Sequence, residues 1–120
     1  IGHASVVGRR VWHAGRELSC GYVEGVGVGA DHRRRGVGDA LMAELERVIR
    51  ADYDLGALSA TDAGAALYSA RGWRRWEGPL FVRAPAGLQR TAGDDGSVYV
   101  LGDLDVAGEL TCDWRAGDVW

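Results

Sequence analysis

Lysine is absent from this chain: all 14 basic residues are arginine. A P-loop requires a lysine that reaches the phosphates of a nucleotide, so the composition excludes that class of site. Cysteine is scarce, and the spacing of Cys20 and Cys112 fits neither a metal-ligand motif nor a disulfide framework. We therefore predict two free thiols and no metal site.

Long apolar runs are missing as well. No stretch is long enough to cross a membrane and no signal-peptide pattern is present, which predicts a cytoplasmic protein with no membrane partner. The net charge of −3 disfavours nucleic acid as a partner and is compatible with a cationic substrate. The chain has 120 residues, 47% hydrophobic and 26% charged, without an internal repeat or a linker, which predicts one globular domain over residues 1–120.

What the chain does contain is a strand, a turn and a helix in residues 21–49. β-Branched and aromatic residues up to Val28 predict a buried strand, and apolar residues recur at helical spacing over residues 37–49. The turn reads RRRGVG at residues 33–38. Glycines at a helix start expose unpaired backbone N–H groups and arginines add ionic contacts, so this turn can hold a pyrophosphate. Its spacing is not GxGxxG, and an ordinary solvated arginine-rich loop is the alternative.

Glu24 stands out because it is the one charged residue in the apolar part of this strand. A buried and unpaired carboxylate is costly, so its side chain points to solvent, forms a salt bridge or lies in a cleft where it has a function. Glycines at positions 25, 27 and 29 would let a ligand approach the backbone of the strand closely.

The remaining elements are predicted from the pattern of apolar and turn residues. His3 and His13 are expected to be structural or solvated, because neither has neighbours in the sequence that would complete a catalytic triad. A helix is expected over residues 63–70 and polar loops over residues 85–96 and 102–109. Strands are expected over residues 1–7 extending through 12, from a turn at 13–16 to residue 28, and over 56–60, 73–82, 97–101 and 110–114.

Three separated segments resemble one known family. Val26-Gly27-Val28, followed by residues 33–38, is similar to the acetyl-CoA-binding signature of the GNAT superfamily of N-acetyltransferases. With GALSATDAGAALYSARGW at residues 56–73 and the ending CDWRAGDVW, the chain resembles the aminoglycoside 2'-N-acetyltransferases over nearly its whole length. The resemblance implies an α/β fold with a mixed, largely antiparallel sheet that is flanked by helices and splayed where the coenzyme enters.

The resemblance also implies a reaction and the residues that carry it. Acetyl-CoA would be the cosubstrate, and its acetyl group would pass to the 2'-amine of an aminoglycoside, giving antibiotic resistance. Glu24 would act as the base or anchor the substrate, and Tyr68 would protonate the leaving thiolate, because a phenol of pKa about 10 stays protonated until needed. The coenzyme would contact Val26, Gly27, Val28, Arg33, Arg34, Arg35, Gly36, Val37 and Gly38. The substrate would contact Glu24, Ser59, Asp94, Asp118 and the carboxylate of Trp120.

Compared with this family, the chain looks truncated at its N-terminus. Ile1 lies inside a predicted strand, and the family's first strand, first two helices and next strand have no counterpart before it. Those helices form one wall of the substrate cleft in the family, so two alternatives stay open. One is a GNAT enzyme acting on another cationic amine, and the other is a non-catalytic fragment that binds coenzyme A. A homodimer is compatible with the resemblance, since dimers are common among such relatives.

Overall fold

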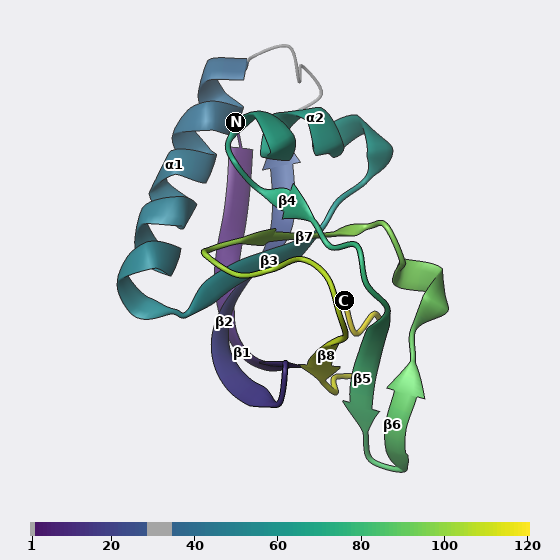
Figure 1. The fold of residues 1–120 in the computed structure, drawn as a ribbon. Coiled ribbons are helices and arrows are strands. Elements are labelled where there is room, and N and C mark those ends of the chain that lie inside the picture. Colours follow the sequence, from purple (N-terminus) through teal and green to yellow (C-terminus); the bar gives the residue numbers. More distant parts are fainter. Residues whose placement is uncertain (1, 29–34) are drawn as a thin grey trace.

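The computed structural model describes the backbone of residues 2–28 and 35–120 and the side chains of residues 4–24 and 39–120 (Figure 1). Within these residues, one mixed sheet has the strand order β4-β7-β3-β2-β1-β8-β5-β6. The pairs β2–β3 and β5–β8 are parallel and the other neighbours are antiparallel. This arrangement confirms the predicted α/β class with a largely antiparallel sheet. The elements are β1 (Gly2–His13), β2 (Arg16–Val28), α1 (Arg35–Asp52), β3 (Leu55–Ser59), α2 (Asp62–Ala70), β4 (Arg74–Arg75), β5 (Leu80–Ala84), β6 (Gly87–Arg90), the 3₁₀ turn η1 (Ala92–Asp94), β7 (Val98–Leu101) and β8 (Leu110–Asp113).

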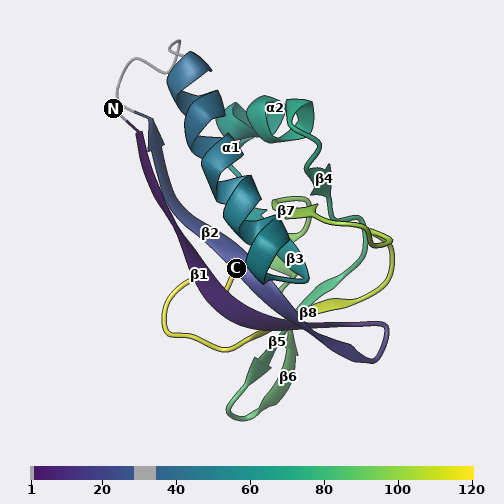
Figure 2. The ribbon, with the colours of Figure 1, turned by 90° about the vertical axis from the view of Figure 1, so that its left-hand side faces the viewer.

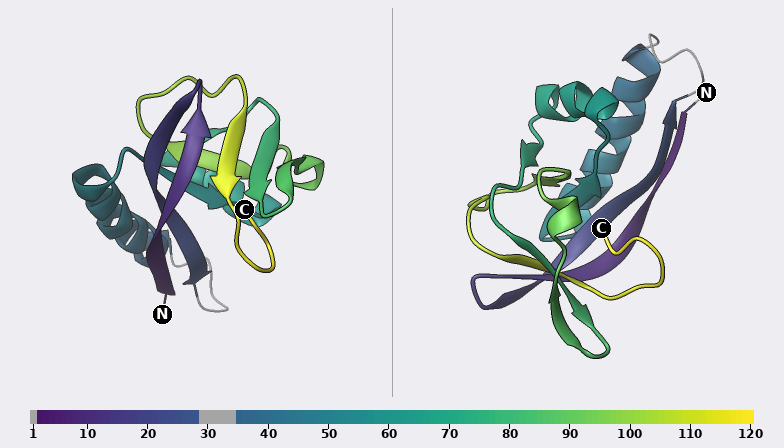
Figure 3. Two further views of the ribbon diagram at one scale, coloured as in Figure 1. Left: turned by 90° about the horizontal axis from the view of Figure 1, so that it is seen from below. Right: turned by 90° about the vertical axis from the view of Figure 1, so that its right-hand side faces the viewer.

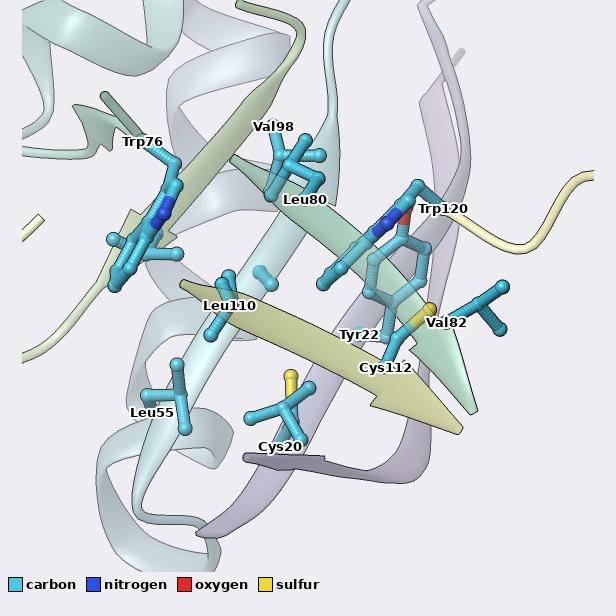
Figure 4. Close-up of a cluster of buried hydrophobic side chains, with 13 residues drawn as sticks. Cys20, Tyr22, Leu55, Trp76, Leu80, Val82, Val98, Leu110, Cys112 and Trp120 are labelled. Atoms are coloured by element: carbon cyan, nitrogen blue, oxygen red, sulfur yellow. The ribbon is translucent and has the colours of Figure 1, made fainter. Parts of the chain in front are cut away.

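The strands send alternate side chains into two apolar clusters, one inside the curl of the sheet and one under the helices. In β7, for example, Val98 and Val100 belong to the first and Tyr99 and Leu101 to the second, as the period of two along a strand requires. Each large side chain that is fully buried stabilises the fold by about 1.5–3 kcal/mol. The inner cluster (Figure 4) comprises Val11, Cys20, Tyr22, Leu55, Ala57, Trp76, Leu80, Val82, Val98, Val100, Leu110, Cys112 and Trp120. The helix-side cluster comprises Val23, Met42, Leu45, Ile49, Leu58, Tyr68, Trp73, Tyr99 and Leu101.

Two glycines let α1 lie close to the sheet. A Cβ atom on Gly21 of β2 would stand 3.0 Å from Ile49 Cγ1, and one on Gly56 of β3 would stand 3.0 Å from two atoms of the same side chain. Any larger residue at either position would push the helix away. The glycines therefore fix where α1 crosses the sheet, and with it the position of the amino-terminal end of the helix.

The buried carboxylate of Glu46 ties α1 to the end of α2. It accepts hydrogen bonds of 2.8 and 2.9 Å from the guanidinium of Arg71 and one of 2.9 Å from the indole N–H of Trp73. Arg71 also reaches Asp39 at 3.2 Å. A buried carboxylate with this many donors is satisfied, so this group is structural.

The strand predicted over residues 73–82 is wrong, because this segment forms two strands in distant parts of the sheet. β4 pairs with β7 at one edge, whereas β5 pairs with β8 and β6 near the other. The connection contains Pro79, which has no N–H to donate to a ladder. Trp76 fastens it through an indole N–H bond of 3.0 Å to the Gly108 carbonyl. The segment thus crosses between the edges of the curled sheet, which Figure 3 shows from below and from the side.

The loop predicted over residues 85–96 is also partly wrong. It contains β6, whose four residues are all exposed, and the short turn η1. The other predicted elements are confirmed with boundaries shifted by a few residues, and both cysteines are free and buried. The structural role predicted for His13 is confirmed: its Nδ1 lies 3.0 Å from the Glu109 carbonyl oxygen, and its ring meets the ring of Trp76 edge-on. Neither described helix is long and apolar enough to span a membrane.

Candidate functional site

The site begins where β2 and β3 separate. Their parallel register runs from Cys20–Leu55 to Tyr22–Ala57, although β2 itself continues to Val28. Figure 2 shows β1 and β2 extending past β3 towards the amino-terminal end of α1. The family resemblance implied a sheet splayed where the coenzyme enters, and in the described residues the pairing of β2 with β3 ends at Tyr22–Ala57.

A β-bulge lies just beyond Glu24 on β2. The register with β1 shifts from Ser5–Glu24 to His3–Gly27, so two residues of β2, Gly25 and Val26, stand opposite one residue of β1. A bulge leaves backbone groups without ladder partners and turns the strand. This geometry makes N–H groups of β2 available to a ligand at the point where the two parallel strands separate.

The predicted pyrophosphate turn lies only partly within the described residues. Arg33 and Arg34 fall outside them, while residues 35–38 form the first turn of α1. That turn contains no acidic residue, so no carboxylate of its own neutralises the positive end of the helix dipole. The backbone of this 18-residue helix is therefore suited to an anion at its start.

Glu24 forms an ion pair with Arg115, a residue that sequence reasoning did not single out. The two side chains are about equally exposed, at 33% for Glu24 and 30% for Arg115. Arg115 lies in the segment after β8, and its Nε–H donates a 2.8 Å hydrogen bond to the Asp118 carbonyl oxygen. Of the alternatives for Glu24, the structure shows the salt bridge.

Two guanidinium groups gather around the ring of Tyr22. Cζ of Arg9 lies 4.8 Å and Cζ of Arg115 lies 5.1 Å from its centroid. Arg9 is buried and donates to Asp113 through bonds of 2.9 Å to Oδ1 and 2.7 Å to the carbonyl oxygen. Burial and the charge of Arg9 lower the pKa of Arg115, while burial raises the pKa of Tyr22. The charged form of Arg115 is thus less stable here than in solvent.

The structure brings two further predicted carboxylates close together. Asp94, in η1, is partly buried and its pKa is raised, first by burial and then by the negative charges of Asp118 and Asp95. Asp118 lies in the same segment as Arg115. Trp120 anchors this segment: it is 4% exposed, and its indole N–H donates to Thr91 Oγ1 at 3.1 Å. Residues that are far apart in the sequence thereby meet on one side of the sheet.

Ser59 and Tyr68 lie at the other border of the separation. Ser59 is exposed at the end of β3, opposite Val98 of β7. Tyr68, on α2, is buried in the helix-side cluster with its ring 6.4 Å from that of Trp73 and 6.5 Å from that of Tyr99. Burial raises the pKa of Tyr68, so its phenol stays protonated at neutral pH.

The predicted residues therefore fall into two groups. In the first, Arg115 pairs with Glu24 and donates to the main-chain carbonyl of Asp118, and the charge of Asp118 raises the pKa of Asp94. In the second, Tyr68 belongs to the helix-side cluster, to which α1 contributes Met42, Leu45 and Ile49. An amine bound by the carboxylates and an anionic ligand bound at α1 would meet where β2 and β3 part.

The raised pKa of Asp94 predicts that Asp94→Asn stabilises the protein at about pH 7. The ionised carboxyl costs folding energy above its raised pKa, and that cost disappears as the pH falls to the unfolded value of about 3.9. The melting temperature of Asp94→Asn should thus exceed that of the parent at neutral pH and match it in acid.

Asp95→Asn is the matched control, because hydrogen bonding to Arg90 lowers the pKa of Asp95. Its effect on stability should have the opposite sign. Asp95→Asn should be less stable than the parent at neutral pH, and this difference should vanish as the pH falls through the depressed pKa of Asp95. Equal shifts for both variants would contradict the charge crowding at Asp94.

Comparisons with known proteins identify a family and a relative. Residues 1–76 match the family model described as an acetyltransferase (GNAT) domain. A curated relative, the aminoglycoside 2'-N-acetyltransferase of Mycolicibacterium fortuitum, is 47% identical over 127 aligned positions. The alignment covers 100% of this chain and 65% of the relative, so the chain spans just under two thirds of that protein's length.

Proposed function

Because the chain belongs to the GNAT acetyltransferase family, we propose that it transfers an acetyl group from acetyl-CoA to the 2'-amine of aminoglycosides. The family supports the acetyl transfer. The choice of acceptor rests on the 47% identity to an aminoglycoside 2'-N-acetyltransferase and on the charges of the site. Acetylation of that amine removes a positive charge from the drug, which is the basis of the proposed antibiotic resistance.

The observation that carries the proposal is the charge distribution at the end of the chain: Asp118 is near enough to raise the pKa of Asp94, and Arg115 of the same segment pairs with Glu24. Glu24, Asp94 and Asp118 come from β2, from η1 and from the segment after β8. An aminoglycoside is a multiple cation at neutral pH, and carboxylates that crowd one another gain most from such a ligand. The exposed Ser59 adds a hydroxyl partner at the same strand ends.

The residues present fit acetyl-CoA on the helix side. Backbone N–H groups of Val26, Gly27 and Val28 would contact its thioester arm beyond the bulge. The start of α1 would hold the pyrophosphate together with the arginines and glycines of residues 33–38. When bound, the coenzyme supplies an acetyl group activated as a thioester. No metal takes part in the proposed site.

Glu24 would prepare the amine. The acceptor arrives as an ammonium ion, which has no lone pair, and a carboxylate at the strand separation can take its proton directly or through a water. Holding the amine in line with the carbonyl adds a second contribution from proximity. The N–H groups beyond the bulge would donate to the carbonyl oxygen as negative charge develops there.

Tyr68 would protonate the leaving group. The nitrogen loses two protons between ammonium and amide; the second would go to solvent, from which the phenolate would be protonated again. The departing sulfur leaves as a thiolate, and the buried phenol, protonated at neutral pH, can give it a proton. Proton loss from the amine and proton gain at the sulfur would then both take place at the β2–β3 separation, where the two ligands would meet.

A Tyr68→Phe variant is expected to lose about 100-fold in kcat, because the proton donor is removed while the ring is kept. Its packing against Trp73 and Tyr99 is preserved, so the melting temperature should change little. Steady-state kinetics with a thiol reagent measure the effect. Tyr99→Phe, a buried tyrosine of the same cluster, is the control and should keep kcat within about threefold.

The proposed function itself is tested by thiol release from acetyl-CoA with this 120-residue chain. Aminoglycosides that carry a 2'-amine should be turned over, and those with a 2'-hydroxyl should not. Turnover of both groups would contradict the regiochemistry. Turnover of neither, with acetyl-CoA still bound in a calorimeter, would contradict catalysis by this chain and leave coenzyme binding.

A further inference from the structure

The segment between β8 and Trp120 is a loop fixed at both ends. Asp113, just before it, accepts a 2.9 Å hydrogen bond from the buried Arg9 of β1, and Trp120, just after it, is buried in the inner cluster. Between these anchors, residues 114–118 form no helix or strand, and Gly117 has a φ of +80°. Figure 3 shows this segment leaving the sheet and returning to its inside.

Arg115 is the side chain of this loop that reaches β2. It pairs with the Glu24 carboxylate and lies over the Tyr22 ring, 5.1 Å from Cζ to centroid. The oxygen that meets Arg115, Oε1, is buried, but about a third of the Glu24 side chain as a whole is exposed to solvent. A soluble cation can therefore compete for the same carboxylate.

The surroundings of Arg115 disfavour a charged side chain. Arg9 places a second guanidinium on the same aromatic ring, and burial and this neighbour both disfavour the charged form of Arg115. An ammonium group presented from solvent would meet the same carboxylate without needing the loop to stay closed. These surroundings make the charged side chain of Arg115 less stable at this position, which favours its exchange for another cation.

We propose that Arg115 is a latch that occupies the amine-binding carboxylate of Glu24 in the acceptor-free protein and is displaced by the ammonium group of the acceptor. This rests on the proposed function, because Glu24 is its amine site. Binding of the acceptor and release of the 114–118 loop from β2 are then one event.

The latch has a consequence for selectivity. A monocation gains one ion pair with Glu24 but breaks the existing pair with Arg115, so its net ionic gain is small. A polycation also reaches Asp94 and Asp118, whose crowded charges favour another cation. The site therefore discriminates against simple amines without a steric barrier.

The test is direct binding of two amines to the 120-residue chain without acetyl-CoA, measured by calorimetry at about 0.15 M salt. Glucosamine serves as the monocation and neamine as the polycation. Arg115→Gln should raise the affinity for both amines by the same factor, about fivefold, because neither amine then has to break the ion pair between Glu24 and Arg115. Arg10→Gln, which removes the same charge from an exposed position on β1, should change either affinity by less than about twofold.

Weaker or unchanged binding by Arg115→Gln would overturn the latch, and so would an effect that grows with the charge of the ligand. Arg115→Lys is a second variant, expected to fall between the parent and Arg115→Gln. If the parent protein binds neither amine, the latch proposal is also overturned.

A spectroscopic readout separates displacement from a general loss of charge. The ¹⁵Nε–¹H resonance of Arg115 should move when neamine saturates the parent protein. In Glu24→Gln it should already lie near the displaced position and respond little to neamine. A resonance that stays fixed at saturation overturns the proposal.

These measurements involve no acetyl transfer. Displacement without turnover would leave the latch standing and contradict the proposed enzyme activity. Turnover of 2'-amines with an unmoved Arg115 would support the proposed enzyme activity and overturn the latch.

Discussion

A Glu24→Gln variant is expected to lose about 10²–10⁴-fold in kcat/KM for a 2'-amino aminoglycoside. The amide keeps the size of the side chain but cannot take a proton or balance an ammonium charge. Thiol release from acetyl-CoA measures the loss, and the affinity for acetyl-CoA should be unchanged because the proposed coenzyme site lies on the helix side. Full activity of the variant would contradict the assignment of Glu24.

The pH profile of this variant separates the two roles proposed for Glu24. If the carboxylate acts as the base, the variant should recover activity in alkali, where the amine loses its proton to solvent. If it only anchors the amine, KM rises and alkali brings no recovery. Glu17→Gln is the matched control, since Glu17 is an exposed carboxylate on the same strand and should leave the kinetics unchanged.

Trp120→Ala is expected to reduce the free energy of unfolding by about 3–5 kcal/mol. The side chain is 4% exposed and fills the inner cluster between strands that are distant in the sequence. Its loss leaves a cavity and frees the segment that carries Arg115 and Asp118. Urea denaturation measures the change, and neamine binding should weaken in parallel.

Trp120→Phe refines this prediction. It retains an aromatic ring but loses the indole N–H that donates to Thr91, a bond of 3.1 Å whose removal costs about 0.5–1.5 kcal/mol. A loss as large as that of the alanine variant would show that the hydrogen bond, and not the packing, holds the segment. A negligible effect of both variants would contradict the anchoring role of Trp120.

Much of the fold was predictable because its signals are local. The helical period over residues 37–49 defines α1, and the apolar run before Val28 defines β2. The prediction failed where the local signal is weak: β6 is exposed at all four residues, so it carries no alternation of apolar and polar side chains. The sequence does contain a signal for the break between β4 and β5, namely Gly78-Pro79. The aromatic and apolar residues around this pair nevertheless led to the prediction of a single strand.

The candidate site was predictable only in part for a related reason. Glu24 is conspicuous in its own strand, so a carboxylate with a function could be proposed from the sequence. Its partner Arg115 is not, because an arginine in a polar segment has no distinctive surroundings. The pairing follows from the sheet order, in which β1 lies between β2 and β8 and brings the end of the chain to Glu24. Only the three-dimensional arrangement supplies that information.

The two antiparallel partners of β1 also set an order for folding. β1 meets β2 across a short turn, whereas its contacts with β8 join residues up to 104 positions apart. Closing so long a loop costs entropy before any contact is gained, so the local pair forms readily and the distant pair late. β2 and α1 can therefore assemble early, while the carboxylates that would receive the amine come together only once β8 has docked.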